Sequence, residues 1–149
     1  MAEPSDLGAM VRMLMDIEEI KKLKAKYWRC VDKKSWDELA EVFAEDATAD
    51  YDPKTHLEGR EAILKFLKDS LGAKTAITAH GGHNPEIEIT GETTARGIWA
   101  LQDYLIMQPN TRLTGYGYYE DEYVKVDGRW KKKSTRITRI VEEWNMTKR

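Results

Sequence analysis

The sequence predicts an α+β domain in which a curved, mostly antiparallel sheet wraps helices on one face. In the first third of the chain, apolar residues recur at intervals of three and four, as they do along one side of a helix. From about residue 75 the interval changes to two, as in strands with one buried face. Helices followed by a run of long strands are typical of domains in which the helices cover one side of an antiparallel sheet.

Length and composition describe one domain over residues 1–149, with an ordered core over about 15–145. The 24 Lys and Arg residues nearly balance the 26 Asp and Glu residues, so we expect neither nucleic acid nor an anionic membrane as a partner. Cys30 is the single cysteine, and no apolar run is long enough for a membrane span or a secretory signal. We therefore expect a cytoplasmic protein.

The first helix is predicted from about Leu14, after a frayed start at residues 1–7, to residues 32–34. Asp32 falls in its last turn, where the negative end of the helix dipole disfavours a carboxylate by about 0.3–1 kcal/mol. A purely structural role for Asp32 is therefore unfavourable. The apolar stripe of this helix, opposite a run of lysines, consists of Ile17, Ile20, Leu23, Tyr27 and Val31.

Two more helices and a strand follow. Ser35-Trp36-Asp37-Glu38 has the form of a capping box, and it predicts a second helix that ends at Glu45-Asp46, with Val42 and Phe43 on its inner side. Residues 47–51 alternate as a strand. A third helix is predicted from Gly59, with Gly72 placed to end it.

The remaining strands are separated by turn-forming residues. Asp127-Gly128 is the strongest hairpin signal, and Gln108-Pro109-Asn110 ends the longest strand. Glycines at 97, 115 and 117 would let long strands bend. The predicted strands are Thr75–His80, Glu86–Thr90, Ala95–Met107, Gly115–Val126 and Trp130–Trp144, with a turn at residues 90–93.

Asp103 is the first candidate for chemistry. It lies on the odd side of the longest strand, together with Trp99 and Leu101, so its carboxylate would be buried among apolar side chains. Burial of a carboxylate is costly unless it is paired or protonated. An ion pair with Arg136 or Arg139 from a neighbouring strand would explain Asp103 without any chemistry.

His80 and His83 are the second candidates, in the loop-like segment at residues 78–85. Histidine is the usual general base near neutral pH, although one at a strand end is often only a hydrogen-bonded structural residue. Both histidines with an acid could also hold a metal, but their Gly-Gly spacing matches no strong metal motif.

Tyr27 and Tyr51 combine an apolar ring with a hydroxyl group. Each could be an ordinary core residue, and together they could hydrogen-bond a carbonyl oxygen and stabilise an enolate. Cys30 lacks the sequence context of a nucleophile and is expected to be a small buried residue. The sequence has no glycine-rich phosphate loop, nucleophile elbow or dinucleotide fingerprint, which argues against nucleotide-dependent chemistry.

These stretches resemble a known family. Over about residues 15–145, the runs KAKYWRCVD, SWDELAEVFAEDA, GREAI and DEYVKVDGRWK resemble the polyketide-cyclase (SnoaL-like) branch of the nuclear-transport-factor-2-like superfamily. The resemblance is greatest to the bile acid 7α-dehydratases, with scytalone dehydratase and hexachlorocyclohexane dehydrochlorinase as more distant relatives. It implies a cone-shaped α+β barrel of the cystatin type, with the N-terminal helices packed in the curved sheet.

The resemblance also implies a site. It places a tyrosine and an aspartate five residues apart at Tyr27 and Asp32, which an ideal helix would turn about 140° from each other, so the spacing alone does not bring them together. A general base falls on His80 and another aspartate on Asp103, within WALQDYLI. The implied catalytic residues are His80, Asp32, Tyr27 and Asp103, and the implied substrate contacts are Tyr51, His83 and Trp99.

We therefore expect a cofactor-independent dehydratase without a metal. His80, oriented by Asp32, would remove a proton from carbon; a tyrosine would bind the oxyanion, and Asp103 would assist the departing hydroxyl. The expected substrate is a small hydrophobic, hydroxylated and carbonyl-bearing ring compound of steroid or polyketide type.

The same sequence is compatible with three other functions. One is an isomerase or cyclase of the ketosteroid isomerase kind, with the same base and a different leaving group. Another is a non-enzymatic small-molecule-binding protein in which His80 and Asp103 satisfy each other, and the third is an assembly subunit like those of ring-hydroxylating oxygenases. A homo-oligomer, a trimer or alternatively a dimer, is expected through the outer side of the sheet, with Ile98, Tyr104, Ile106 and Trp144.

Overall fold

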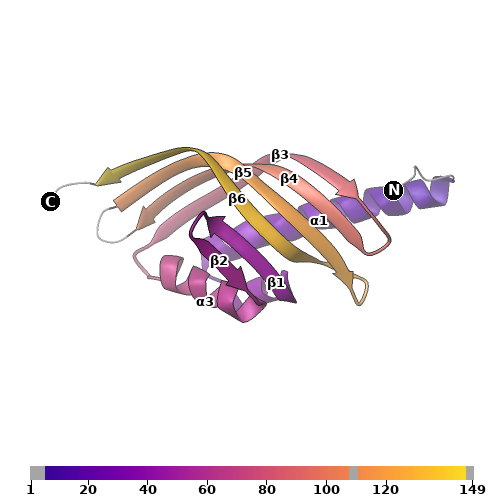
Figure 1. Cartoon of the computed structure of the whole chain (residues 1–149), viewed down its shortest axis with the longest axis horizontal. Coiled ribbons are helices and arrows are strands. Elements are labelled where there is room, and N and C mark those ends of the chain that lie inside the picture. The colour runs from indigo at the N-terminus through magenta and orange to yellow at the C-terminus, as the bar shows by residue number, and fades with distance from the viewer. Residues whose placement is uncertain (1–5, 108–110, 147–149) are drawn as a thin grey trace.

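The computed structural model describes residues 6–107 and 111–146, and it shows a long helix lying along a strongly bent sheet (Figure 1). The predicted break at residues 108–110 and most of the predicted frayed start lie outside the described residues. The elements are α1 (Leu7–Lys33), α2 (Trp36–Ala40), β1 (Phe43–Asp52), β2 (Thr55–Glu58), α3 (Arg60–Leu71), β3 (Ile77–Ile89), β4 (Thr94–Met107), β5 (Thr111–Val126) and β6 (Arg129–Met146).

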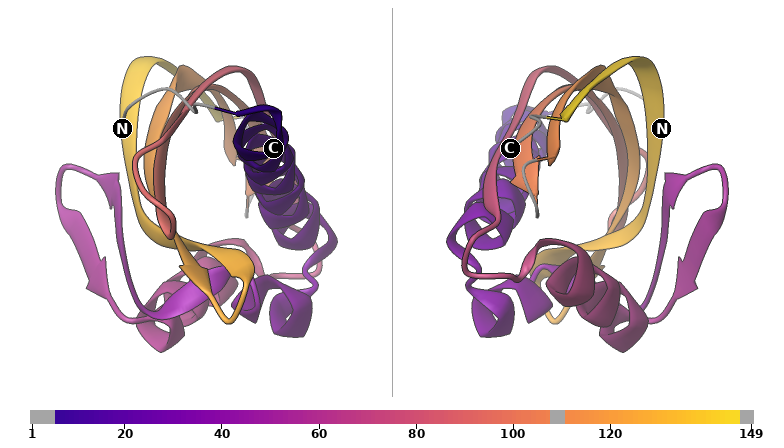
Figure 2. Two further views of the ribbon diagram at one scale, coloured as in Figure 1. Left: turned by 90° about the vertical axis from the view of Figure 1, so that its right-hand side faces the viewer. Right: turned by 90° about the vertical axis from the view of Figure 1, so that its left-hand side faces the viewer.

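The six strands form one sheet in the order β2-β1-β6-β5-β4-β3. Neighbouring strands are antiparallel except for β1 and β6, which run parallel. Seen from its ends, the sheet curls into an arch whose open side is occupied by α1 and α3 (Figure 2). The sheet does not close, because β2 and β3 remain its two edges. The predicted fold class, helices packed in a curved and mostly antiparallel sheet, is confirmed.

Helix α1 begins earlier than predicted. Asp6 caps its first turn by accepting a hydrogen bond of 2.8 Å from the Ala9 N–H. Most apolar side chains of the first two turns, including Leu7 and Leu14, are exposed. The amphipathic stripe on which the prediction relied therefore does not mark this end of the helix.

The second helix is shorter than predicted and β1 starts earlier. The Ser35 side chain makes no capping hydrogen bond, and the Glu38 carboxylate instead lies 2.5 Å from the Arg29 guanidinium. The Val42 carbonyl accepts a hydrogen bond of 2.8 Å from the Lys132 N–H, and β1 begins at the next residue. Pairing with β6 therefore replaces the helix that the local pattern favoured.

The two strands predicted at Thr75–His80 and Glu86–Thr90 form a single strand, β3. β3 runs continuously through the segment predicted as a loop and pairs with β4 along its length. A bulge between His83 and Glu86, where Asn84 has a φ of 51°, interrupts the register. The β2 strand was not predicted, whereas the Asp127-Gly128 hairpin is confirmed, with φ angles of 50° and 75°. Gly72 ends α3 as predicted.

The bulges also change which side chains share a face. Ile98 and Tyr104 are exposed on the outer face, as predicted. The β5–β6 register shifts between Tyr116 and Gly117, and Trp144 consequently pairs with the buried Leu113. Trp144 therefore lies on the inner face, and its predicted place in an outer interface is wrong.

The inner face of the sheet and the helices enclose one hydrophobic core. Trp28 of α1 packs edge-on against Trp99, with ring centroids 5.5 Å apart. A Cβ atom at Gly82 would stand 2.1 Å from the Trp28 ring, so β3 lacks a side chain where the indole contacts it. Within the described ranges, no helix is long and apolar enough to cross a membrane.

We predict that Gly82→Ala lowers the free energy of unfolding by about 1–3 kcal/mol, because the new methyl group displaces the Trp28 ring. Gly81→Ala is the matched control, since a Cβ atom there would meet its nearest neighbour, the Gln102 carbonyl oxygen, at 3.5 Å. Its stability should stay within about 0.5 kcal/mol of the wild type. Urea unfolding checks both, and equal stability of the two variants would contradict the packing described.

Candidate active site

Asp32 and His80 form the first part of the site. Asp32 Oδ1 lies 2.6 Å from His80 Nδ1. The same carboxylate accepts hydrogen bonds from the His80 N–H (3.0 Å) and the Thr78 hydroxyl (2.8 Å). The side chain of Asp32 is 25% exposed and that of His80 is 9% exposed. These three donors explain why an acid stands at the unfavourable end of the α1 dipole.

This contact leaves one nitrogen of His80 for proton transfer. A hydrogen bond from Nδ1–H to a carboxylate fixes the tautomer in which Nε2 carries the lone pair. β3 is an edge strand, so the His80 N–H is not required by another strand and can bind Asp32. The position of His80 at a sheet edge is therefore part of how the pair is built.

Asp103 is the second part of the site. The β3–β4 register places it directly opposite His80. Such cross-strand neighbours point to the same face, with Cβ atoms about 4.5–5.5 Å apart. Asp103 is 1% exposed, so the acid predicted to be buried on the apolar side of this strand is confirmed there.

Arg139 pairs with Asp103, and Arg136 does not. Arg139 Nη2 lies 2.7 Å from Asp103 Oδ2, whereas Arg136 Nε lies 3.9 Å from Asp50 on the other face. Gly115 of β5 lies between the two partners, and a Cβ atom there would stand 2.3 Å from Arg139 Nη1. The missing side chain makes room for the guanidinium. Because His80 and Asp103 have different partners, they do not satisfy each other as one alternative supposed.

Tyr27 and Tyr51 meet through their hydroxyl groups, whose oxygens are 3.3 Å apart. The Tyr51 ring stacks on Phe66 of α3, with centroids 5.5 Å apart. Burial raises the pKa of both phenols, so they keep their protons at neutral pH and can donate hydrogen bonds. Among the described residues, no hydrogen bond joins either phenol to Asp32 or His80.

Trp99 and His83 occupy different surroundings from each other. Trp99 is buried, and its Nε1–H donates a hydrogen bond of 3.0 Å to the Tyr123 hydroxyl. His83 is exposed and pairs with Ala100, on the face opposite to His80. The structure therefore does not bring His83 together with His80. In the described part of the chain, no three His, Cys, Asp or Glu side chains form a group that could hold a metal ion.

Sequence reasoning missed a buried group of charges, which we call the lysine cluster: Lys24, Asp121 and Lys132. All three side chains have no solvent exposure. Lys24 Nζ lies 2.5 Å from Asp121 Oδ2, and Lys132 Nζ lies 3.6 Å from Asp121 Oδ1. Asp121 also accepts hydrogen bonds from the hydroxyls of Tyr123 (2.8 Å) and Thr135 (2.5 Å).

The cluster lies against aromatic rings. Lys24 Nζ is 3.6 Å from the centroid of the Tyr119 ring, and Lys132 Nζ is 4.0 Å from that of Tyr27. Burial lowers the pKa of both lysines, with Asp121 opposing the shift. Burial alone would raise the pKa of Asp121, but Lys132 and Lys24 outweigh it, and the pKa ends below its usual range.

Two sequence signals could have found this cluster. Lys24 lies four residues after Ile20 and three before Tyr27, so it is on the apolar stripe of α1. The prediction had placed the lysines of this helix on the opposite side. Asp121 shares its side of β5 with Tyr119 and Tyr123, as Asp103 does with apolar residues in β4.

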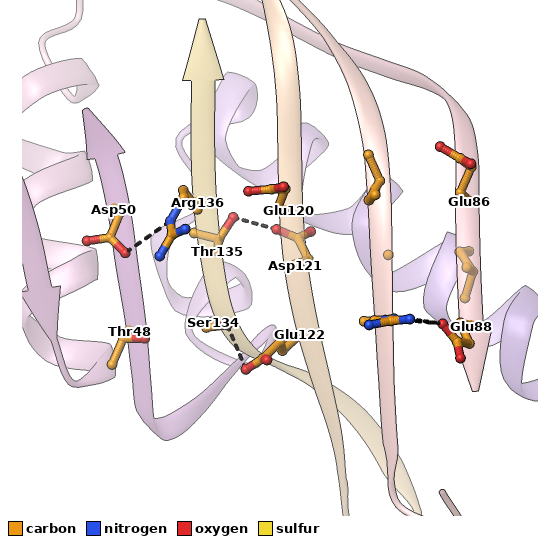
Figure 3. Close-up of a pocket in the computed structure, with 14 residues that line it drawn as sticks. Thr48, Asp50, Glu86, Glu88, Glu120, Asp121, Glu122, Ser134, Thr135 and Arg136 are labelled. Carbon is orange, nitrogen blue, oxygen red and sulfur yellow. Dashed lines mark hydrogen bonds and ion pairs between the residues drawn. The ribbon is translucent and has the colours of Figure 1, made fainter. Parts of the chain in front are cut away.

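A hollow of about 860 Å³ lies on the outer face of the sheet (Figure 3), and His80 is not among the residues that line it. Its charged side chains are partly paired, with Arg96 Nη2 2.5 Å from Glu88. A second hollow, of about 590 Å³, is lined by Asp50, Asp52, Pro53, Arg136, Ile137, Thr138, Arg139 and Glu142. The second hollow touches the site at Arg139, and its volume is within the range of small-molecule pockets.

The fold and these residues define an open α+β cone with a histidine–aspartate pair on its inner face. The chain belongs to the SnoaL-like domain family, whose model matches residues 12–136. Solved structures with this fold include a nuclear-transport-factor-2-like protein with a cystatin-like fold from Novosphingobium aromaticivorans, with 19% identity and a TM-score of 0.76 over 94% of this chain and 92% of that one.

Three further relatives are informative. A protein from Novosphingobium aromaticivorans, provisionally named a scytalone dehydratase, is 28% identical, with a TM-score of 0.79 over 91% of each chain. A hexachlorocyclohexane dehydrochlorinase of type 2 is 20% identical, with a TM-score of 0.81 over 91% of this chain and 92% of that one, which shows a shared fold. An uncharacterized Mycobacterium tuberculosis protein is 25% identical over 89% of this chain and 87% of its own.

We predict that Lys132→Met is at least as stable as the wild type near neutral pH, because it removes an ammonium that buries its charge without a hydrogen bond. Its advantage should shrink between about pH 7 and about pH 9.5. The pKa of Lys132 is lowered in the folded state, so the unfolded wild type binds more protons in this range and wild-type stability rises with pH.

Asp121→Asn is the opposite case, since it leaves two buried amines without a carboxylate. It should cost about 3–5 kcal/mol. Urea unfolding of both variants at the two pH values is the measurement. A Lys132→Met protein less stable than Asp121→Asn at neutral pH would refute this description of the cluster.

Proposed function

We propose that this protein is a cofactor-independent lyase that removes water from a hydroxylated, carbonyl-bearing ring compound. The observation that carries the proposal is the Asp32–His80 pair, which stands on the inner face of the sheet directly opposite Asp103. A base held by a carboxylate beside a second acid is what an elimination next to a carbonyl requires. The 28% identical relative named for dehydration is consistent with this class of reaction.

His80 is the proposed base. With Nδ1 bound to Asp32, its Nε2 would take a proton from the carbon next to the substrate carbonyl. Asp32 also accepts two further hydrogen bonds, which hold the imidazole in one orientation. A positioned base of this kind typically contributes about 10²–10⁴-fold to the rate.

Different residues would bind the oxyanion and assist the leaving group. Tyr27 and Tyr51 keep their protons because burial raises their pKa values, so either phenol can donate a hydrogen bond to an enolate oxygen. Asp103 would direct the departing hydroxyl, with its charge balanced by Arg139 at 2.7 Å. The proton removed by His80 and the departing hydroxyl together leave as water, and a carbon–carbon double bond forms.

The substrate is proposed to be hydrophobic and cyclic. The inner face around Asp103 presents Trp99, Leu101 and Leu105, with few polar groups besides those named. The hollow of about 590 Å³ at Arg139 would admit a ring compound from the β1–β6 side.

We predict that His80→Ala lowers kcat by at least about 10²-fold on any substrate that the wild type dehydrates. Hydroxylated cyclic ketones, 3-oxo steroids among them, would be screened by ultraviolet absorbance, because elimination creates a conjugated chromophore. His83→Ala is the matched control: its exposed side chain is on the other face, so turnover should change by less than about twofold.

The outcomes separate the alternatives. Turnover that survives His80→Ala would refute the base assignment. A product that retains its oxygen would indicate an isomerase or cyclase with the same base. Ligand binding without turnover, in both the wild type and the variant, would favour a non-enzymatic binding protein.

For Asp103→Asn we predict a loss in kcat with little change in KM, because the carboxylate acts on the leaving group in the transition state. The amide keeps the shape of the side chain but leaves the charge of Arg139 without its partner. Steady-state kinetics on the substrate found above checks this. A change in KM alone would assign Asp103 to binding.

A further inference from the structure

The lysine cluster is adjacent to the phenol pair of the proposed site. Lys132 Nζ lies 4.0 Å from the centroid of the Tyr27 ring, and the hydroxyl of that ring is 3.3 Å from Tyr51. Lys24 Nζ lies 5.3 Å from the same ring. One tyrosine ring therefore has two buried amines within 5.3 Å of its centroid and the second phenol at its hydroxyl end.

The cluster holds more amines than carboxylates. Two amines face one carboxylate, and Asp121 is already bonded to Lys24, Tyr123 and Thr135. Lys132 Nζ is fully buried and has no hydrogen-bond partner among the described residues. The aromatic rings around it offer only the weaker attraction of a ring face for a cation. Lys132 is therefore held by its ion pair with Asp121 at 3.6 Å and by ring faces, without a hydrogen bond.

We propose that the buried charge of Lys132, which has no hydrogen bond and is held against the Tyr27 ring, makes the Tyr27–Tyr51 end of the site selective for ligands that carry or develop an oxyanion. The proposal rests on the proposed function, in which these phenols bind the enolate oxygen, and it names the electrostatic origin of that preference. Lys132 is a positioning residue here, because it acts through Tyr27 and does not touch the ligand.

Lys132 and the Tyr27 ring are buried, so they lie in a region of low dielectric. An anion bound at the phenol hydroxyls would lie beyond the edge of the Tyr27 ring, whose centroid is 4.0 Å from Lys132 Nζ. A nearby opposite charge in a region of low dielectric lowers the pH at which an acid ionises, by about one to three units at close range. The titratable groups facing Lys132 are Lys24 and Tyr27 from α1 and Tyr119 and Asp121 from β5. Asp121 is the only anion among these four, and it is shared with Lys24.

The test uses 4-nitrophenol, whose phenolate absorbs in the visible range, and needs no turnover. In wild-type protein, the bound nitrophenol should ionise at a pH lower by at least about one unit than free nitrophenol. In Lys132→Met the bound ligand should ionise within about half a unit of the free one, while nitrobenzene, which cannot ionise, binds both proteins equally. A merely structural role for Lys132 would alter the binding of nitrobenzene as well.

Two controls complete the experiment. Lys133→Met removes a partly exposed lysine from the next position of β6, where it pairs with Asp46, and should ionise the ligand as the wild type does. His83→Ala, on the other face of the sheet, should also leave ligand ionisation unchanged. Ionisation is measured without turnover, so failure of the base assignment at His80 is distinguishable from failure of this proposal.

Three results would overturn the proposal. They are a wild type that binds nitrophenol no better than nitrobenzene, a wild type whose bound nitrophenol ionises like the free compound, and a Lys132→Met protein that retains the wild-type shift. If Lys132→Met does not fold, Lys132→Gln is measured in its place, since it also removes the charge, and the same outcomes apply.

Discussion

The site depends on one carboxylate that joins the end of a helix to the edge of a sheet. Asp32 stands where the dipole of α1 disfavours it, and it accepts donors from Thr78 and from both the backbone and the ring of His80. β3 can offer its His80 N–H because it is an edge strand. The same contact fixes the imidazole tautomer and holds α1 against the open side of the sheet, so the geometry of the base follows from the architecture.

The inner face carries two separate groups of charges, and they are balanced differently. Asp103 has one arginine partner at 2.7 Å, reached across a glycine. The lysine cluster has two amines and one carboxylate, with no solvent exposure. Burying an ion pair rarely stabilises a protein more than apolar packing would, so these buried charges are not explained by stability alone.

Family membership and chemistry are established by different observations. The match to the SnoaL-like domain over residues 12–136 and the shared cone-shaped architecture assign the chain to its family. A fold of this kind hosts many functions, so the proposed elimination is derived from His80, Asp32 and Asp103 and not from the fold.

The sequence by itself determined the periodic features: an α+β fold, a hairpin at Asp127-Gly128, and an acid on the buried side of β4 at Asp103. These are local patterns, because alternation and turn chemistry depend on neighbouring residues. Only the tertiary structure decided which residues these elements pair with and contact. Strand pairing replaced the last part of the predicted second helix, and a bulge turned Trp144 to the inner face. Lys24 is a core residue, with a carboxylate nearly a hundred positions away beside it. A local pattern can place Lys24 or Asp121 on a buried face, but it does not identify the partner distant in sequence or the register that aligns the two.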